Sequence, residues 1–272
     1  MSHRRMSDTR AWTTLTRETE SGPLTAFARP GTGTPIVFVH GVMADAYAWR
    51  AVAGKVSPER PALIVNRRGR TPSGPIPGGY SVGSEVDDLM GWLDLQDEPV
   101  VVVGHSYGGL IAVEAVRQGA PVRSLVLYEP VTRPFAPEAV PLVTGAISDG
   151  DLGRAVEVIN IDVSGYSTEH VDQLRSSPAW DKLELLAAPA GDELVAIADF
   201  DLDVPSPWRT PTTLIAGALS RHRAPYGPSV DAFRNALGID EVFVLAGQDH
   251  LAHVTAPADL AGAIEQGLEG RG

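Results

Sequence analysis

Short runs of β-branched and other apolar residues recur along the chain, each followed by a turn marked by glycine or proline and then by a stretch with helical spacing. Six such runs are candidates for buried strands: residues 36–39, 62–65, 100–103, 125–128, 212–215 and 241–245. Nearly continuous apolar character is typical of strands that are covered on both faces. The alternation of strands and helices therefore predicts a mostly parallel sheet with helices on both faces.

Three further segments complete this pattern. Apolar residues at steps of three and four predict helices over residues 82–93 and 257–268. Residues 12–28, with a turn at residues 21–23, predict a hairpin that supplies antiparallel strands at one edge of the sheet.

The strand signal stops between residues 133 and 208, where helix-like stretches and scattered aromatic residues take its place. We interpret residues 133–208 as a helical cap, inserted after the sixth strand into a core made of residues 1–132 and 209–272. The alternative is an ordinary run of surface helices. The cap is favoured because one site-forming strand end precedes the segment and another follows it, and ligands gather at such ends in open α/β sheets.

The composition is that of a globular chain and removes several classes of function. Of the 272 residues, 43% are hydrophobic and 21% are charged, which is ordinary for a domain. The absence of cysteine excludes disulfides, thiolate metal sites and a cysteine nucleophile. The net charge of −12 argues against a nucleic-acid surface. The basic residues 1–5 lead into no apolar stretch and no run approaches a membrane span, so we expect a cytoplasmic protein.

The four valines of residues 100–103 lead directly into Gly104-His105-Ser106-Tyr107-Gly108, a G-x-S-x-G sequence, and a helix-compatible stretch follows. With a strand before it and a helix after it, such a serine acts as a nucleophile. Its backbone must be strained so that Oγ projects above the sheet, and glycines two positions away on either side let strand and helix pass closely. We therefore assign the nucleophile to Ser106.

A serine nucleophile needs two preorganised N–H donors for the oxyanion that forms during attack. We expect one to be the N–H of Tyr107, directly after the nucleophile. The other is expected to be the N–H of Val42, in the loop after residues 36–39, where Gly41 lets the chain turn. His40 is interpreted as bracing this loop by hydrogen bonds, the alternative being a catalytic base.

The base should lie late in the chain, because in this arrangement the order is serine, acid, histidine. Residues 246–253, after the last predicted strand, contain the two candidates His250 and His253. We assign the base to His250, which immediately follows the turn, and a structural or pocket-lining role to His253.

Together these motifs resemble the actinobacterial type of α/β-hydrolase fold family 1, over nearly the whole chain. The resemblance is carried by Phe38-Val39-His40-Gly41-Val42, Asn66-Arg67-Arg68-Gly69-Arg70, Gly104-His105-Ser106-Tyr107-Gly108-Gly109, Leu127-Tyr128-Glu129-Pro130 and Gly247-Gln248-Asp249-His250. It implies an α/β-hydrolase fold with a mostly parallel eight-stranded sheet, helices on both faces and a helical cap. It also implies that neither a metal nor a cofactor takes part.

The acid of the triad departs from the family's pattern. In similar proteins it usually follows the seventh strand, at the end of a Gly-x-x-Asp sequence, but here residues 217–220 read Gly-Ala-Leu-Ser. Ser220 could donate a hydrogen bond to an imidazole, but it could not stabilise the positive form as a carboxylate would. We therefore assign the acid to Glu129, at the end of the sixth strand, where similar hydrolases are known to place it.

Two alternatives to this assignment are open. In the first, Glu129 pairs with Arg68 or Arg133 and only holds the cap. In the second, Asp249 is the acid, although its side chain would usually point away from the neighbouring His250.

Arg67, Arg68 and Arg70 form a basic cluster just past the fourth strand. A phosphate site is one interpretation. Ion pairs that position the loop beneath the cap are favoured, because the chain is acidic overall. Asn66 stands where many relatives have an acidic residue, so the ion pairing of this loop is expected to be altered.

These assignments predict a serine hydrolase that acts on an ester, lactone or thioester of a small, largely apolar molecule, through an acyl-enzyme on Ser106. The alternative is a non-hydrolytic enzyme of the same fold that performs elimination, cyclisation or acyl transfer in natural-product biosynthesis, which a water-excluding cap favours. A catalytically silent receptor is less favoured because nucleophile, base and oxyanion loop are all present. Epoxide and haloalkane hydrolysis are disfavoured because they need a carboxylate nucleophile.

Specificity is expected to reside in the cap. Each candidate pocket residue could equally belong to the core; the candidates are His40, Trp49, Tyr128, Phe135, Trp180 and Trp208. We expect a small-molecule substrate and no metal, cofactor, nucleic-acid or membrane partner, and the pattern carries no signal for oligomeric state.

Overall fold

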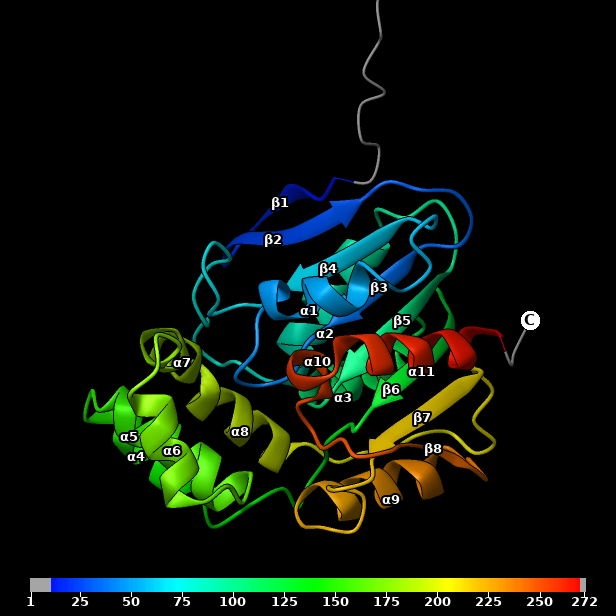
Figure 1. Ribbon diagram of the computed structural model, residues 1–272. Helices are drawn as coiled ribbons and strands as arrows, with labels where there is room; N and C mark the ends of the chain where they lie inside the picture. Colours follow the sequence, from blue (N-terminus) through cyan, green and yellow to red (C-terminus); the bar gives the residue numbers. More distant parts are fainter. Residues whose placement is uncertain (1–10, 270–272) are drawn as a thin grey trace, which may run out of the picture.

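The computed structural model describes residues 11–269, so the basic residues 1–5 lie outside the described range. Within this range one eight-stranded sheet has the order β1-β2-β4-β3-β5-β6-β7-β8 (Figure 1). Its strands are β1 (Thr13–Thr19), β2 (Gly22–Arg29), β3 (Ile36–Val39), β4 (Ala62–Asn66), β5 (Val100–His105), β6 (Val122–Tyr128), β7 (Thr212–Gly217) and β8 (Val242–Leu245). Pairing is antiparallel from β1 to β2 and from β2 to β4, and parallel elsewhere. The predicted mostly parallel sheet is confirmed.

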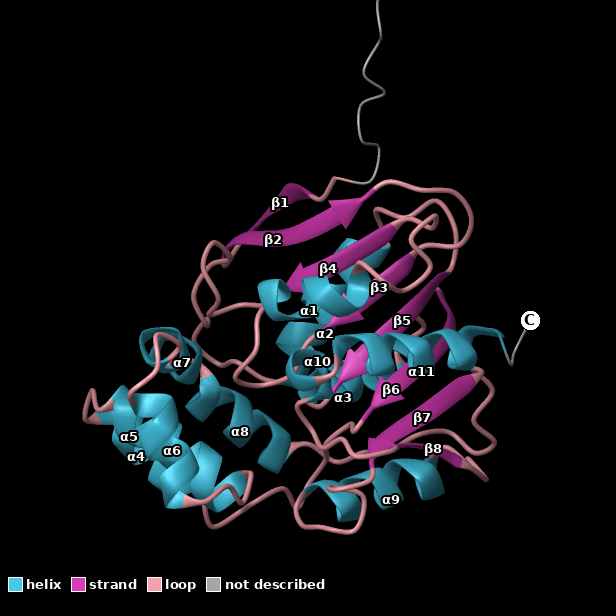
Figure 2. Cartoon of the chain, in the orientation of Figure 1, coloured by secondary structure: helices cyan, strands magenta, loops and turns pink. Residues whose placement is uncertain are grey.

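Helices cover both faces of the sheet, as the alternating pattern predicts (Figure 2). They are α1 (Ala46–Ala53), α2 (Val82–Leu93), α3 (Tyr107–Arg117), α9 (Tyr226–Ala236), α10 (Ala252–Thr255) and α11 (Pro257–Glu269). The side-chain alternation of each strand divides the core into two clusters. Val100 and Val102 join the cluster that contains α2, α3 and α9. Val103 joins the opposite cluster, which contains α1, α10 and α11.

Two elements near the sheet edges differ from expectation. The apolar run at residues 241–245 predicts a central strand covered on both faces, but β8 lies at the edge and Val244 is 48% exposed. Apolar composition alone does not separate a central strand from an edge strand. The turn of the first hairpin lies at residues 20–21 and shares only Ser21 with the predicted turn at residues 21–23, because β2 already begins at Gly22.

Between β6 and β7 all regular secondary structure is helical. We call residues 140–199 the helical insertion; it comprises α4 (Val140–Ser148), α5 (Leu152–Val158), the π-helix η1 (Ile159–Val163), α6 (Thr168–Arg175), α7 (Trp180–Ala187) and α8 (Ala190–Asp199). These helices gather beside the carboxyl-terminal ends of the parallel strands (Figure 1). That edge is where the loops with the chemically interesting residues emerge. None of the described helices is long and apolar enough to span a bilayer.

Candidate active site

Ser106 occupies a strained turn between β5 and α3. Its backbone has φ 54° and ψ −124°, a conformation that a non-glycine residue holds only under constraint. The close crossing of strand and helix explains the flanking glycines: a Cβ on Gly104 would lie 2.7 Å from Cα of Gly109, and one on Gly108 would lie 2.1 Å from the oxygen of Val39. The turn thus lifts Ser106 to the carboxyl edge of the sheet.

The loop after β3 lies against this serine. A Cβ on Gly41 would lie 2.6 Å from Cβ of Ser106, so only glycine fits there. Within residues 11–269, the N–H of Val42 donates no hydrogen bond. Tyr107 is the first residue of α3, so its N–H has no acceptor inside the helix. Two backbone donors without protein acceptors therefore flank the serine.

His250 lies on the loop between β8 and α10 and is 9% exposed. Its ring stacks on Tyr226 at a centroid distance of 4.0 Å, and His105 lies at 4.5 Å. Burial raises the pKa of Tyr226 to about 12, so the phenol facing the imidazole stays protonated. In the described part of the chain, Ser106 Oγ and His250 share no hydrogen bond. Such contacts are often long in free enzymes and tighten when substrate binds.

Glu129 directly follows β6 and is completely buried beside His250. Its Oε2 lies 2.7 Å from Nδ1 of His250. Its Oε1 accepts hydrogen bonds from the N–H of Gly217, at 2.7 Å, and from the hydroxyl of Ser220. The backbone φ of Glu129 is 43°, so the acid, like the serine, is held in the left-handed region. The carboxylate is fixed by three donors and faces the imidazole.

Ser220 plays a part other than the one considered from sequence. Its hydroxyl donates to Glu129 and not to the imidazole, because β6 and β7 are neighbouring strands whose ends meet at this point. The residue at the usual position of the acid therefore supports the displaced acid. No signal in the sequence gives this direction of the hydroxyl.

The residues of both alternatives, a pairing of Glu129 with Arg68 or Arg133 and Asp249 as the acid, bind other groups. Arg68 forms a bidentate pair with Asp88, and Arg133 pairs with Asp201. The carboxylate of Asp249 accepts from the N–H of Leu251 at 2.9 Å and from the hydroxyl of Tyr166 at 3.2 Å. No arginine contacts Glu129 among residues 11–269.

Three further histidines surround the site and are buried. His105 donates from Nε2 to the carbonyl of His250 at 3.1 Å, and His253 stacks on Trp49 at 5.2 Å. Burial, reinforced by His250, lowers the pKa of His105 well below its usual value and that of His253 to about 3. Burial and then the Arg67 charge also lower the pKa of His40. All three imidazoles are therefore neutral at physiological pH.

The arginine cluster after β4 forms ion pairs. Arg68 binds Asp88 with its Nε at 2.5 Å. Arg67 contacts Glu85 of α2 at 2.7 Å and Glu193 of α8 at 2.6 Å, and Arg70 binds Glu193 at 2.5 Å. No fork of the cluster is directed at an open phosphate site, because each guanidinium is already engaged by a carboxylate. The preceding Asn66 uses its amide to donate to the Arg70 carbonyl at 2.7 Å.

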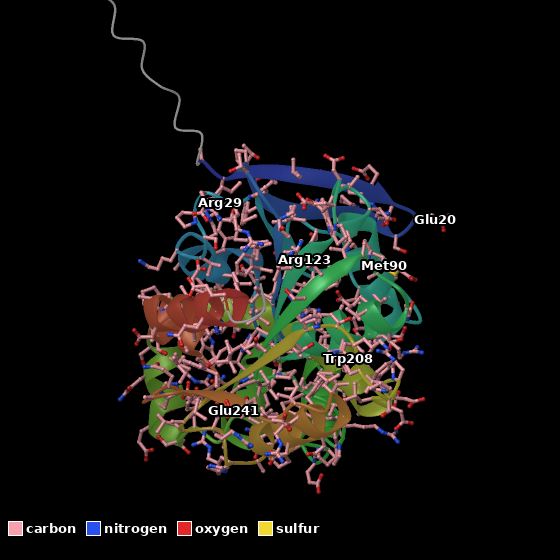
Figure 3. The ribbon with its side chains drawn as sticks, turned by 90° about the vertical axis from the view of Figure 1, so that its right-hand side faces the viewer. Glu20, Arg29, Met90, Arg123, Trp208 and Glu241 are labelled. Carbon is pink, nitrogen blue, oxygen red and sulfur yellow. The ribbon has the colours of Figure 1, made fainter. Side chains whose placement is uncertain are left out.

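The structure disperses the candidate pocket residues. Trp49 and His40 are buried beneath the site, Trp49 against His253 and His40 against its own loop. Trp208 hydrogen-bonds Thr212 at the amino-terminal end of β7; Figure 3 shows it on the side from which β6 to β8 begin. Trp49 and His40 thus lie in the core, which the sequence left open for every candidate, and Trp208 precedes the start of β7. Aromatic or histidine identity alone does not say which end of the sheet, or which layer, a side chain occupies.

The remaining candidates lie on different sides of the site. Tyr128 stacks on His105, and its hydroxyl donates to the carbonyl of Asp249. Phe135 packs edge-on against Tyr226, at 5.7 Å, and so lies one ring away from His250. Trp180 lies inside the helical insertion, where its Nε1 donates to Glu184. Tyr226, which no sequence pattern singled out, is the aromatic side chain stacked on the imidazole.

No group of three histidine, aspartate or glutamate side chains arranged to hold a metal ion occurs within residues 11–269. The buried carboxylates near the site are instead bound by imidazole, hydroxyl or guanidinium groups.

The chain is similar to known proteins in its sequence and in its structure. Lipase LipV of Mycobacterium tuberculosis is 35% identical over 97 residues, which are 35% of this chain and 36% of the lipase, so the chain spans about a third of the curated relatives it matches. An alpha/beta hydrolase from Sphaerobacter thermophilus superposes with a TM-score of 0.78 at 22% identity, over 93% of this chain and 100% of that one. A thermophilic esterase from Thermogutta terrifontis gives 0.72 at 22% identity, over 96% and 99%.

These structural likenesses confirm the predicted α/β-hydrolase fold, since identities this low carry the fold alone. The model of one family, described as the alpha/beta hydrolase family, matches residues 36–263. This match includes the nucleophile turn, the loop after β3 and the loop of His250. The chain belongs to the alpha/beta hydrolase family.

Proposed function

We propose that the protein is a serine hydrolase that cleaves an ester, lactone or thioester of a small, largely apolar molecule through an acyl-enzyme on Ser106. The observation that carries the proposal is the pair of His250 and Glu129, joined at 2.7 Å beside a serine in a strained strand-to-helix turn. A carboxylate on Nδ1 leaves Nε2 of the imidazole free to accept a proton. The esterase and lipase among the similar proteins support the same class of reaction.

The residues divide the reaction as follows. His250 takes the proton of Ser106 as Oγ attacks the carbonyl carbon, and Glu129 stabilises the imidazolium that forms. The N–H groups of Val42 and Tyr107 bind the oxyanion. His250 returns the proton to the departing alcohol or thiol, and then activates the water that releases the acyl group.

The surroundings of the serine favour an apolar acyl or alcohol group. A single cluster of buried apolar residues includes Tyr107 of the nucleophile turn, Phe135, and Val143 and Ile159 of the helical insertion. The buried charges nearest the serine are paired internally, so they offer no free cation for an anionic substrate. In this proposal the helical insertion is the cap that selects the substrate.

A second function is favoured by one observation. Ser106 is 5% exposed and His250 is 9% exposed, so little of either side chain is open to solvent. A closed site protects intermediates from hydrolysis, which suits elimination, cyclisation or acyl transfer on the same residues. In that case Ser106 would react with a serine-directed probe, but no simple ester would be turned over.

The test compares the wild-type protein with Ser106→Ala. A fluorophosphonate probe should label the wild type at Ser106, and p-nitrophenyl esters of graded chain length should be hydrolysed. Ser106→Ala should lose both labelling and at least about a thousandfold of the turnover, because only binding and the oxyanion donors remain. Ser124→Ala, near the amino-terminal end of β6 and so away from the candidate site, is the matched control and should retain both labelling and turnover.

The outcomes separate the candidates. Unchanged turnover in Ser106→Ala would contradict any role for this serine. Labelling of the wild type without turnover of esters, lactones or thioesters would replace hydrolysis by the second function. Mass spectrometry of the protein mixed with a slow ester should detect the acyl group on the peptide that carries Ser106.

A further inference from the structure

Glu193 is a buried carboxylate that the proposed reaction does not use. It lies on α8 of the helical insertion and has no exposed surface. Its two oxygens bind Arg70 at 2.5 and 2.8 Å, and the oxygen nearer to Arg67 lies 2.6 Å from that guanidinium. The insertion is therefore joined to the loop after β4 by charges that are shielded from solvent. Gly69 of this loop is also tightly covered, since a Cβ there would lie 2.6 Å from Pro189.

Arg67 connects this joint to the oxyanion loop. Its Nε donates to the carbonyl of His40 at 3.0 Å, and its Nη2 donates to the carbonyl of Gly41 at 2.9 Å. Burial alone would lower the pKa of Arg67, but the carboxylates of Glu193 and Glu85 raise it above the ordinary value for arginine. The guanidinium is thus a permanent cation clamped between the insertion and the loop that follows β3.

The bond to Gly41 orients a specific peptide group. The C=O of Gly41 and the N–H of Val42 belong to one planar trans peptide, so they point in opposite directions. Fixing the carbonyl on Arg67 therefore aims the N–H of Val42 away from Arg67. The same carbonyl also accepts from Nδ1 of His40 at 2.9 Å, in the tautomer that lets Nε2 accept from the N–H of Arg67 at 3.3 Å. Two donors thus hold and polarise the peptide that carries the proposed oxyanion donor.

We infer that Glu193 is a positioning residue that couples the helical insertion to the oxyanion hole, acting through Arg67 on the Gly41–Val42 peptide. The inference rests on the proposed function in assigning the N–H of Val42 to the oxyanion. With Glu193 in place, Arg67 is drawn onto the carbonyls of His40 and Gly41, and the donor is aligned. When α8 moves away, Arg67 loses one of its two carboxylate partners, and the Gly41–Val42 peptide is held less firmly. The Val42 N–H is therefore aligned for the oxyanion only when α8 is packed against the loop after β4.

The experiment measures the reaction of Ser106 with a fluorophosphonate, whose phosphoryl oxygen occupies the oxyanion hole. The rate is followed to saturation so that the affinity for the probe, KI, is separated from the maximal rate, kinact. Glu193→Gln keeps the shape of the side chain and removes its charge. Because this change leaves an extra buried cation, the charge-balanced variant Arg70→Met/Glu193→Gln is measured beside it. Circular dichroism checks that each variant is folded.

Lys182→Met is the matched control, because Lys182 of α7 pairs at 2.8 Å with Asp45, the N-cap residue of α1 at the far end of the loop after β3, and does not contact the Gly41–Val42 peptide. We expect kinact to fall about tenfold in both Glu193 variants with KI unchanged, which is less than the loss of a whole oxyanion donor. Lys182→Met should leave both constants as in the wild type. In parallel, the affinity for a trifluoromethyl ketone, whose adduct carries an oxyanion, should fall by the same factor.

Three results would overturn the inference. In the first, the folded double variant reacts with unchanged kinact. In the second, KI rises while kinact stays constant, as it would if Glu193 only held the insertion in place. In the third, Lys182→Met lowers kinact as much as the Glu193 variants do. A wild type that is labelled but hydrolyses no ester would contradict the proposed function alone, since the probe still reports the oxyanion hole. A wild type that is not labelled would contradict both.

Discussion

Two buried carboxylates are connected to the residues around the nucleophile, Glu129 through His250 and Glu193 through Arg67, and their surroundings differ in kind. Glu129 and Glu193 are both completely shielded from solvent. The partners of Glu129 are a backbone N–H at the end of β7, a hydroxyl from the loop after β7 and an imidazole from the loop after β8. The partners of Glu193 are two guanidinium groups from the loop after β4. We call these surroundings the acid region and the arginine region.

The difference lies in which charges can change. The arginine region has permanent cations on one side and carboxylates on the other, so its charges stay balanced throughout a reaction. The acid region contains a negative group whose partner can gain a proton, so a positive charge can form there during attack on a substrate. Two sites of equal burial are therefore suited to different tasks. The acid region transfers and stabilises charge, and the arginine region holds the loop after β4 and the helical insertion in register.

The largest expected effect comes from Glu129→Gln, which removes the charge of the acid region without removing its volume. The amide can donate to Nδ1 of His250, which favours the tautomer whose Nε2 carries a proton and cannot act as a base. We expect kcat to fall by about 10³ to 10⁴ with little change in KM. Steady-state hydrolysis of a p-nitrophenyl ester measures this.

The same variant should stay close to the wild type in stability, because glutamine keeps the volume of the side chain and the change leaves no arginine or lysine without its carboxylate partner. The lost hydrogen bonding should cost on the order of 1 kcal/mol of the free energy of unfolding in urea. A loss of activity accompanied by unfolding would contradict the assignment, since it would make Glu129 a structural residue.

In the arginine region, Glu193→Gln should lower stability more than Glu129→Gln does and activity less. Removing one carboxylate leaves an uncompensated buried cation, which typically costs about 3–5 kcal/mol of the free energy of unfolding. Arg70→Met/Glu193→Gln should cost less, because the remaining pair of Arg67 and Glu85 is again balanced. Urea titrations of the two variants compare their midpoints. Equal losses in both would show that packing, and not charge balance, sets the stability of this region.

The fold was predictable from the sequence to the extent that local patterns determine it. Apolar runs predict strands, and the runs at residues 36–39 and 62–65 coincide with β3 and β4 to within one residue. The G-x-S-x-G turn was readable because it requires small residues at fixed spacing, which the contacts of Gly104 and Gly108 bear out. The edge position of β8 was not readable, because strand order depends on connections that composition does not encode.

The two carboxylate regions show a similar limit. Glu129 could be singled out as a carboxylate at a strand end, but the hydroxyl of Ser220 reaches it only because β6 and β7 are neighbours in space. The partnership of Arg67 with Glu193 joins residues 126 positions apart on a loop and an inserted helix. Side chains that meet through tertiary packing leave no spacing signal in the chain. The arginine region therefore had to be found in the structure.

A smaller effect is expected from pH, and it should arise beside the acid region. Burial holds the pKa of His253 at about 3, whereas an unfolded histidine titrates near 6.5, as roughly expected for model peptides. The unfolded chain therefore gains a proton that the folded chain refuses, so stability is complete above about pH 6.5 and is lost as the pH falls towards 3.

His253→Phe should keep the stacking on Trp49 and remove the part of this sensitivity that comes from His253. The slope of the free energy of unfolding against pH should decrease by up to about 1.4 kcal/mol per pH unit within this window. Urea unfolding at pH 4, 5, 6 and 7 measures the slope. His170→Gln, on the partly exposed face of α6, is the control and should leave the slope unchanged. An equally steep profile in His253→Phe would mean that other groups account for the acid sensitivity.

The smallest expected effect tests how the acid region holds its carboxylate. Ser220→Ala removes one of the two donors on Oε1 of Glu129 and leaves the N–H of Gly217 in place. Because the imidazole contact is on the other oxygen, Oε2, we expect kcat to fall only about fivefold, corresponding to roughly 1 kcal/mol for one hydrogen bond. Ser220→Thr keeps the hydroxyl and should recover most of the rate if the added methyl group fits.

The activity of the double variant Glu129→Gln/Ser220→Asp shows whether the reaction requires the acid at the position of Glu129 or only a carboxylate near the imidazole. The new carboxylate stands beside the old one, at the end of the neighbouring strand, so it is placed to face the same imidazole. It should return at least about tenfold of the activity lost in Glu129→Gln, since a carboxylate near Nδ1 restores the correct tautomer. If the double variant is folded and as inactive as Glu129→Gln, the strained backbone of Glu129 is itself required, and the two strand ends are not interchangeable.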